Sequence, residues 1–206
     1  PPSRVFHSMA ATSNGILLHG GIATADATSA FDDTWRWNGT AWTRIGGDGV
    51  NTSWATADNI EYVASLNFFG GNLYAGTASS TGDGDVWRFN GTSWTKIGGD
   101  GVNSGWAAST YELVASLAND GTNLYAGTAN SNGDGEVWRW NGTAWTKIGG
   151  DGINSGWSTN QGDGVYSMAF SAGQLYSGLY DTGGDGLFYR WNGTAWTRIG
   201  GGYFNE

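Results

Sequence analysis

Short stretches in which apolar and polar residues alternate recur along the chain, separated by glycine-rich turns. Between residues 62 and 97 four such stretches predict β-strands at about Tyr62–Asn67, Leu73–Thr77, Asp85–Phe89 and Thr92–Ile97. Each shows the two-residue period of a strand that buries one face. No helical period lies between the copies of this pattern, so we expect an all-β chain.

The four-strand pattern occurs four times. An aromatic residue followed by Asn-Gly-Thr marks each copy at Asn38, Asn90, Asn141 and Asn192, which are 52, 51 and 51 positions apart. Periods of this size are typical of solenoids and propellers, in which each unit buries its face on a neighbour. Four short strands per unit match a propeller blade. The sequence therefore predicts an all-β β-propeller with four four-stranded antiparallel blades, or part of a larger propeller.

We expect a single propeller domain over residues 1–206. The blades are predicted at about residues 4–47, 61–99, 112–150 and 163–201. Long links rich in Gly, Asp and Trp join them at residues 48–60, 100–111 and 151–162. A homo-oligomeric ring is an alternative way to complete the propeller.

The last two strands of each copy are predicted to form a hairpin at Asn-Gly. If Asn90 and Gly91 form a two-residue type I′ loop, Trp87 lies opposite Trp94 and Asp85 opposite Lys96. The same register gives these pairs in the other copies: Trp35/Trp42, Asp33/Arg44, Trp138/Trp145, Glu136/Lys147 and Tyr189/Trp196. Cross-strand pairs of this kind each stabilise a sheet by roughly 0.2–1 kcal/mol.

The first copy resembles the kelch repeat, the blade of kelch and galactose-oxidase-like propellers. The matching residues are Pro2, Arg4, His7, Ser8, Gly20, Gly21, Asp33, Trp35 and Trp42. The other copies depart from the repeat, because they carry Ala75-Gly76, Ala126-Gly127 and Ser177-Gly178 where the family has two glycines. The resemblance implies a propeller but no particular function, since that family includes enzymes, lectins and scaffolds. The copper chemistry of galactose oxidase cannot be carried over, because it needs a cysteine and the chain has none.

Composition narrows the range of partners. The formal charge is −9, which argues against a nucleic-acid partner, since binding phosphate backbones requires a basic surface. No apolar run is long enough for membrane insertion. The 37 glycines fit the many tight turns of short strands.

The long links share one face of the predicted propeller with the loops between the second and third strands, whereas the opposite face has only tight turns. Each of three links offers an Asp, an Asn and a Trp, and loops on a rigid scaffold commonly carry binding residues. Flat aromatic rings beside amide or carboxylate groups suit sugars. The candidate ligand-binding residues are Asp48, Asn51, Trp54, Asp100, Asn103, Trp106, Asp151, Asn154 and Trp157. In the alternative interpretation the tryptophans fold each link onto its blade.

Two further sets of acidic residues are candidates. Asp83, Asp134 and Asp185 lie in Gly-Asp-Gly loops that could contribute to a calcium site, as an alternative to an expectation of no metal and no cofactor. Glu61, Glu112 and Asp163 each precede the first strand of a copy. Because that strand is innermost in a propeller, these acids are candidates for a ring at the rim of the central channel.

Catalysis is not expected from the sequence. There is no cysteine, the two histidines lie in the first copy, and most Asp residues recur in every copy, whereas an active site normally breaks internal symmetry. We therefore predict a non-catalytic extracellular or particle-surface module that binds carbohydrate or surface proteins. The alternative is a structural propeller that assembles a filament, virion or fibre.

Overall fold

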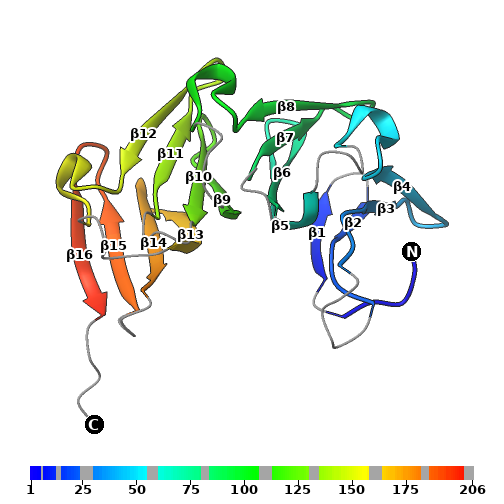
Figure 1. Cartoon of the computed structure of the whole chain (residues 1–206), viewed down its shortest axis with the longest axis horizontal. Coiled ribbons are helices and arrows are strands. Elements are labelled where there is room, and N and C mark those ends of the chain that lie inside the picture. Colours follow the sequence, from blue (N-terminus) through cyan, green and yellow to red (C-terminus); the bar gives the residue numbers. More distant parts are fainter. Residues whose placement is uncertain are drawn as a thin grey trace, which may run out of the picture.

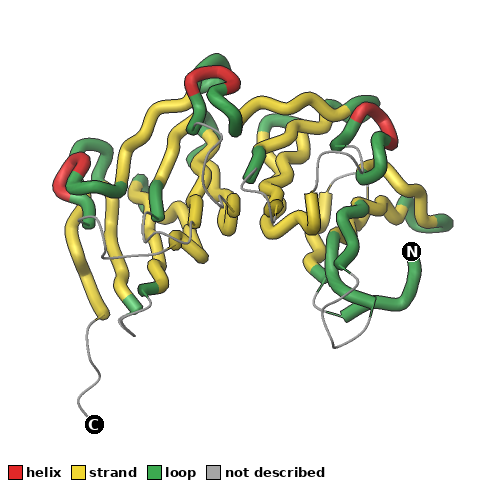
Figure 2. The backbone as a smooth tube through the Cα atoms, in the orientation of Figure 1, coloured by secondary structure: helices red, strands yellow, loops and turns green. Residues whose placement is uncertain are grey.

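The structure is a computed structural model that describes residues 1–5, 7–12, 15–23, 30–54, 60–79, 84–106, 113–129, 135–157, 164–181 and 186–201, except for the side chains of residues 60 and 61. Within these ranges the chain folds into four antiparallel units of four strands each (Figure 1). The regular helix in these ranges consists of short 3₁₀ turns (Figure 2). None of the described helices is long and apolar enough to cross a membrane.

Each unit contains four strands in chain order, and its first strand is the innermost. The first blade consists of β1 (Ser8–Thr12), β2 (Gly15–His19), β3 (Thr34–Trp37) and β4 (Trp42–Gly46). The second consists of β5 (Ile60–Phe69), β6 (Asn72–Ser79), β7 (Val86–Phe89) and β8 (Trp94–Gly98). The third consists of β9 (Leu113–Asn119), β10 (Leu124–Ala129), β11 (Val137–Trp140) and β12 (Trp145–Gly149). The fourth consists of β13 (Gly164–Ser171), β14 (Gln174–Tyr180), β15 (Leu187–Trp191) and β16 (Trp196–Gly201).

The blades stand side by side along an arc, with the first and fourth at its two ends (Figure 1). The inner strands β1, β5, β9 and β13 contact one another in sequence along the concave side. One backbone pair, Ala129 opposite Gly164, also joins the third and fourth blades. This arrangement confirms the predicted β-propeller architecture of four-stranded antiparallel blades.

The hydrophobic core lies between the blades. Ile45 of the first blade packs in one cluster with Trp54 of the link and with Val63 and Trp94 of the second blade. The same cluster recurs at the next two boundaries, around Ile97 with Trp106 and Trp145, and around Ile148 with Trp157 and Trp196. Each of the first three blades therefore buries one face of its sheet on the next blade, as expected for a repeat that cannot bury its apolar face alone.

The register of the hairpins differs from the prediction by two residues. In the second blade Phe89, not Trp87, lies opposite Trp94, and Lys96 lies opposite Trp87. The cause is the side chain of Asn90, whose Oδ1 accepts hydrogen bonds from the backbone N–H groups of Thr92 and Ser93 at 3.0 and 2.9 Å. The turn is therefore an Asx-type turn, and the type I′ prediction is wrong. The corresponding aromatic pairs elsewhere are Trp37/Trp42, Trp140/Trp145 and Trp191/Trp196.

A shift of two residues leaves each side chain on the same face of the sheet. For this reason the predicted ion pair of Lys96 with Asp85 still forms, with Nζ and Oδ1 2.7 Å apart. Lys147 likewise pairs with Glu136. In the first blade the predicted Asp33–Arg44 pair is wrong, because Asp33 forms its ion pair with Arg4 and Arg44 forms one with Asp48.

Candidate functional site

The three link loops that the sequence singled out fold in the same way. Each makes a 3₁₀ turn directly after the outermost strand: η1 (Val50–Thr52), η3 (Val102–Ser104) and η4 (Ile153–Ser155). Their asparagines Asn51, Asn103 and Asn154 take left-handed φ angles of 54–55°, a conformation that asparagine tolerates better than most residues. The repeated sequence thus produces a repeated loop geometry.

The polar candidates in these loops bind the loop to its own blade. The Nδ2 groups of Asn51, Asn103 and Asn154 donate to the carbonyls of Ile45, Ile97 and Ile148 at 3.0–3.1 Å. The carboxylates accept from a basic residue four positions earlier, in the pairs Asp48–Arg44, Asp100–Lys96 and Asp151–Lys147. The side-chain groups proposed for a ligand are therefore engaged in holding the link in place.

The loop tryptophans Trp54, Trp106 and Trp157 are buried, with 0–4% of their surface exposed. Their Nε1 groups donate to the carbonyls of Asp32, Gly84 and Gly135 at 3.1, 2.7 and 2.6 Å. Each ring also packs edge-on against the tryptophan of the next blade, for example Trp106 against Trp145 with centroids 5.5 Å apart. These rings offer no open face for a sugar, so the packing interpretation of the three tryptophans fits their environment.

The acidic candidates fall mostly beyond the described ranges. Asp83, Asp134, Asp185, Glu112 and Asp163 lie outside them, and Glu61 is described in its backbone alone, within β5. Among the described residues no group of three or more His, Asp or Glu side chains is gathered in a way that could hold a metal ion.

A cavity of about 420 Å³ lies on the concave side of the arc, where the inner strands begin. All four blades contribute to it, through the starts of the inner strands and the end of β2. Its lining includes Ser8, His19, Tyr62, Leu113 and Tyr166. The cavity thus lies at the end of the blades where the inner strands begin.

Two half-exposed tyrosines give this cavity aromatic walls. Tyr62 stands near the start of β5 and Tyr166 near the start of β13, with 37% and 52% of their surfaces exposed. The ring of Tyr166 is supported by an edge-on contact with Tyr180, centroid to centroid 5.9 Å. Phenol rings with an apolar face and a hydroxyl at the edge are suited to ligands that are partly apolar and partly hydroxylated.

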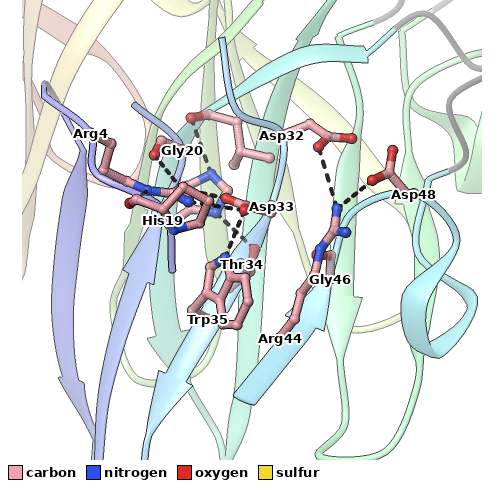
Figure 3. A network of polar contacts seen from close by, with 12 residues as sticks. Arg4, His19, Gly20, Asp32, Asp33, Thr34, Trp35, Arg44, Gly46 and Asp48 are labelled. Atoms are coloured by element: carbon pink, nitrogen blue, oxygen red, sulfur yellow. Dashed lines mark hydrogen bonds and ion pairs between the residues drawn. The ribbon is translucent and has the colours of Figure 1, made fainter. Parts of the chain in front are cut away.

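A buried polar network supports the first-blade wall of the cavity (Figure 3). His19 forms hydrogen bonds through Nδ1 with the Thr34 hydroxyl at 2.8 Å and through Nε2 with the Val63 carbonyl of the second blade at 3.2 Å. Because a carbonyl can only accept, Nε2 carries the proton and Nδ1 accepts from Thr34. Burial lowers the pKa of His19 to about 4, so the ring is neutral at physiological pH. Its two hydrogen bonds link the first blade to the second.

Arg4 and Asp33 form the charged part of the same network (Figure 3). The guanidinium binds Asp33 through two nitrogens, one of them 3.0 Å from Oδ2, and donates to the Gly20 carbonyl at 2.9 Å. Burial tends to raise the pKa of Asp33, but hydrogen bonds from Arg4 and Trp35 outweigh it and hold the pKa below its usual value. This fork-like pairing fixes the N-terminal segment against the second and third strands of the blade.

Sequence reasoning did not find this cavity. Tyr62 and Tyr166 belong to the strands that were predicted, but they come from blades two and four, and only the curvature of the arc brings them to one opening. The one available signal was the acidic residue predicted at the channel rim beside each inner strand, since Glu61 directly precedes Tyr62.

No protein-family model and no curated protein sequence matches the chain. Among solved structures it is similar to the Aleuria aurantia lectin in complex with α-methyl-L-fucoside, with a TM-score of 0.55 and 13% identity over 100% of this chain and 67% of that one. It is also similar to YjhT, with a TM-score of 0.58 and 12% identity over 96% and 71% of the two chains. A third similar structure is the GH74 xyloglucanase of Xanthomonas campestris, with a TM-score of 0.56 and 17% identity over 93% and 29%. The chain thus spans less than a third of the xyloglucanase and about two thirds of the lectin.

These likenesses correct two expectations. The prediction of a non-enzyme is overturned, because the similar structures include several glycoside hydrolases, among them an α-L-arabinofuranosidase and an exo-β-1,3-galactanase. Repetition of the blade is therefore no reason to exclude catalysis in this fold. The similar structures are not kelch proteins in particular, so the kelch resemblance of the first copy is not confirmed beyond the propeller it implied. By its fold the chain is a β-propeller, similar in architecture to lectins and to propeller domains of carbohydrate-active enzymes.

Proposed function

We propose that the chain binds carbohydrate in the cavity at the starts of its inner strands. The observation that carries the proposal is the cavity lined by Tyr62 of the second blade, Tyr166 of the fourth blade, and Ser8 and His19 of the first. Its size of about 420 Å³ lies within the usual range of small-ligand sites. The similar lectin and glycoside hydrolase structures support a glycan as the class of ligand.

The chemistry of the walls fits a sugar better than a purely apolar ligand. The C–H face of a pyranose can stack on a tyrosine ring, while the Ser8 hydroxyl and the phenol groups exchange hydrogen bonds with the sugar hydroxyls. The neutral His19 ring is bonded to Thr34 and Val63, so it shapes the wall and brings no charge. An uncharged glycan is therefore the expected ligand. Because such glycans are displayed on surfaces, an extracellular or particle-surface location is part of this proposal.

A glycan array followed by titration calorimetry with the best ligand tests the site. Tyr166→Ala and Tyr62→Ala should each weaken binding about tenfold, which corresponds to about 1.4 kcal/mol of lost contact. Phe68→Ala is the matched control, because Phe68 is an exposed aromatic residue near the far end of the same strand as Tyr62. Equal binding by all three variants, or no glycan bound on the array, would contradict the proposal.

The same samples show whether the chain acts on the glycan that it binds. Incubation with the best ligand and measurement of newly formed reducing ends would detect hydrolysis. A second candidate function, a propeller that assembles with other chains, is favoured by the exposed apolar side chains of Ile16 on the first blade and of Phe188 and Ile199 on the fourth.

A further inference from the structure

One pair of groups recurs at every boundary between blades. The Nε1 of Trp94 donates to the carbonyl of Ile45, that of Trp145 to Ile97 and that of Trp196 to Ile148, at 2.6, 2.7 and 2.7 Å. The isoleucine belongs to the outermost strand of one blade and the tryptophan to the outermost strand of the next. Each boundary therefore has an acceptor face, which carries the isoleucine, and a donor face, which carries the tryptophan.

The acceptor face of the fourth blade is uncovered. Ile199 occupies the position of Ile45, Ile97 and Ile148, but 51% of its surface is exposed, whereas the other three are 3–4% exposed. Phe188 is half exposed, although Val86 and Val137 at its position are fully buried. Between them lies an apolar groove of about 390 Å³, which is lined also by Ser167 and Tyr176.

Ser167 shows the same contrast on the inner strand. In the second and third blades the equivalent residues, Ser65 and Ser116, are buried. Their hydroxyls donate hydrogen bonds to the backbone carbonyls of Val114 and Val165 in the following blade, at 2.8 and 2.7 Å. The Ser167 side chain is exposed. Both the inner and the outer contacts of a blade boundary are thus available on the fourth blade.

The donor face of the first blade is uncovered in the complementary way. Trp42 occupies the position of Trp94, Trp145 and Trp196, which are 2–3% exposed, yet it is only partly buried. Ile16 is 39% exposed, while Leu73, Leu124 and Leu175 at its position are 0–3% exposed. Trp37 is partly buried as well.

We propose that the donor face of the first blade binds the acceptor face of the fourth blade in a second copy of this chain. The contact would continue the boundary that occurs three times inside the chain, with the indole of Trp42 directed at the carbonyl of Ile199. A second copy is the fitting occupant because each copy carries both halves of the interface, at opposite ends of the arc (Figure 1). Such a head-to-tail interface joins two different surfaces, so it closes into a ring or extends, according to the rotation between copies.

The mass of the 206-residue chain in solution tests this, by sedimentation velocity over a range of concentrations. Wild type should sediment as a dimer or larger ring. Ile199→Asp and Trp42→Asp should each reduce it to the mass of one chain, because a carboxylate would lie in an apolar contact. Thr197→Asp is the control: it adds the same charge on the same strand, at a position that is exposed in all four blades. Near-ultraviolet circular dichroism verifies that each variant remains folded.

A mixing experiment identifies the head-to-tail geometry. Ile199→Asp retains an intact donor face and Trp42→Asp an intact acceptor face, so an equimolar mixture should form a dimer although neither variant associates alone. A wild-type chain that stays a monomer at all concentrations would overturn the proposal. This includes a monomer in which the first blade packs against the fourth blade of the same chain and buries Trp42. Association that survives both substitutions, or a mixture that stays monomeric, would overturn it as well.

Discussion

The indole nitrogen of Trp94 lies 2.6 Å from the carbonyl oxygen of Ile45 and donates a hydrogen bond across the boundary between the first two blades. The same carbonyl accepts from Nδ2 of Asn51 at 3.1 Å, so both of its lone pairs are used. A link residue and a residue of the next blade thus converge on one backbone oxygen. This convergence couples the conformation of each link loop to the docking of the blade that follows it.

The indole hydrogen bond can be tested at the central boundary, where Trp145 is buried and donates to Ile97. Trp145→Phe keeps an aromatic ring but removes the donor, and we expect a loss of about 1–3 kcal/mol in the free energy of unfolding. Urea unfolding followed by circular dichroism measures it. Thr146→Ala, an exposed neighbour, should change stability by less than about 0.5 kcal/mol. Equal stability of Trp145→Phe and wild type would show that the bond contributes nothing.

The link geometry makes a separate prediction at Asn103, which has a left-handed φ of 54° and donates to Ile97 at 3.0 Å. Asn103→Ala loses the hydrogen bond and places a Cβ in an unfavourable backbone conformation, which together should cost about 2 kcal/mol. Asn103→Gly loses only the hydrogen bond and should cost about 1 kcal/mol. Thermal and urea unfolding of the pair separate the two contributions. If glycine were as damaging as alanine, backbone strain would have no part in the loss.

The hairpin turn at Asn90 allows a test of the observed register. Because Oδ1 of Asn90 accepts from Thr92 and Ser93, Asn90→Asp retains the acceptor and should be nearly neutral, whereas Asn90→Ala should cost about 1 kcal/mol. A type I′ turn would give another order, since Asn90→Gly would then be well tolerated. Comparison of the aspartate, alanine and glycine variants by urea unfolding distinguishes the two turns.

The buried histidine predicts a specific dependence of stability on pH. The pKa of His19 is about 4 in the folded chain, whereas its ordinary value, which applies to the unfolded chain, is 6.5. Between pH 4 and pH 6.5 the unfolded chain therefore binds a proton at His19 and the folded chain does not. Stability from this residue is therefore fully present above pH 6.5 and is lost as the pH falls toward 4, by about 3 kcal/mol in total.

His19→Gln provides the reference for that measurement. The variant and the wild type share all other titrating groups, so the contributions of those groups cancel when the two free energies of unfolding are subtracted. The difference in free energy of unfolding between wild type and variant should shrink as the pH falls from 6.5 to 4. Urea unfolding at several pH values in this window gives the difference directly. Parallel pH profiles for the two proteins would contradict the burial of a neutral ring.

The pattern of the sequence determined the local elements. Alternating apolar residues predicted strands in the second blade that lie within or beside β5 to β8, and the 51-residue period predicted the propeller. Properties set by residues a few positions apart, such as strand period and turn placement, can be read from sequence.

The tertiary structure decided everything that depends on a neighbouring blade. Whether Trp106 is a ligand platform or a core residue depends on Trp145, which is 39 positions away and fills the space beside it. His19 acquires its pKa and its role from the Val63 carbonyl, 44 positions along the chain. Tyr62 and Tyr166 share a cavity only because the arc of blades brings the starts of the inner strands together. Burial and hydrogen bonding depend on the neighbours of a residue in space, and in a propeller many of those neighbours belong to the next blade. The repeated local pattern therefore determines the strands of each blade. The contacts between blades determine which residues are buried in the core and which line the cavity.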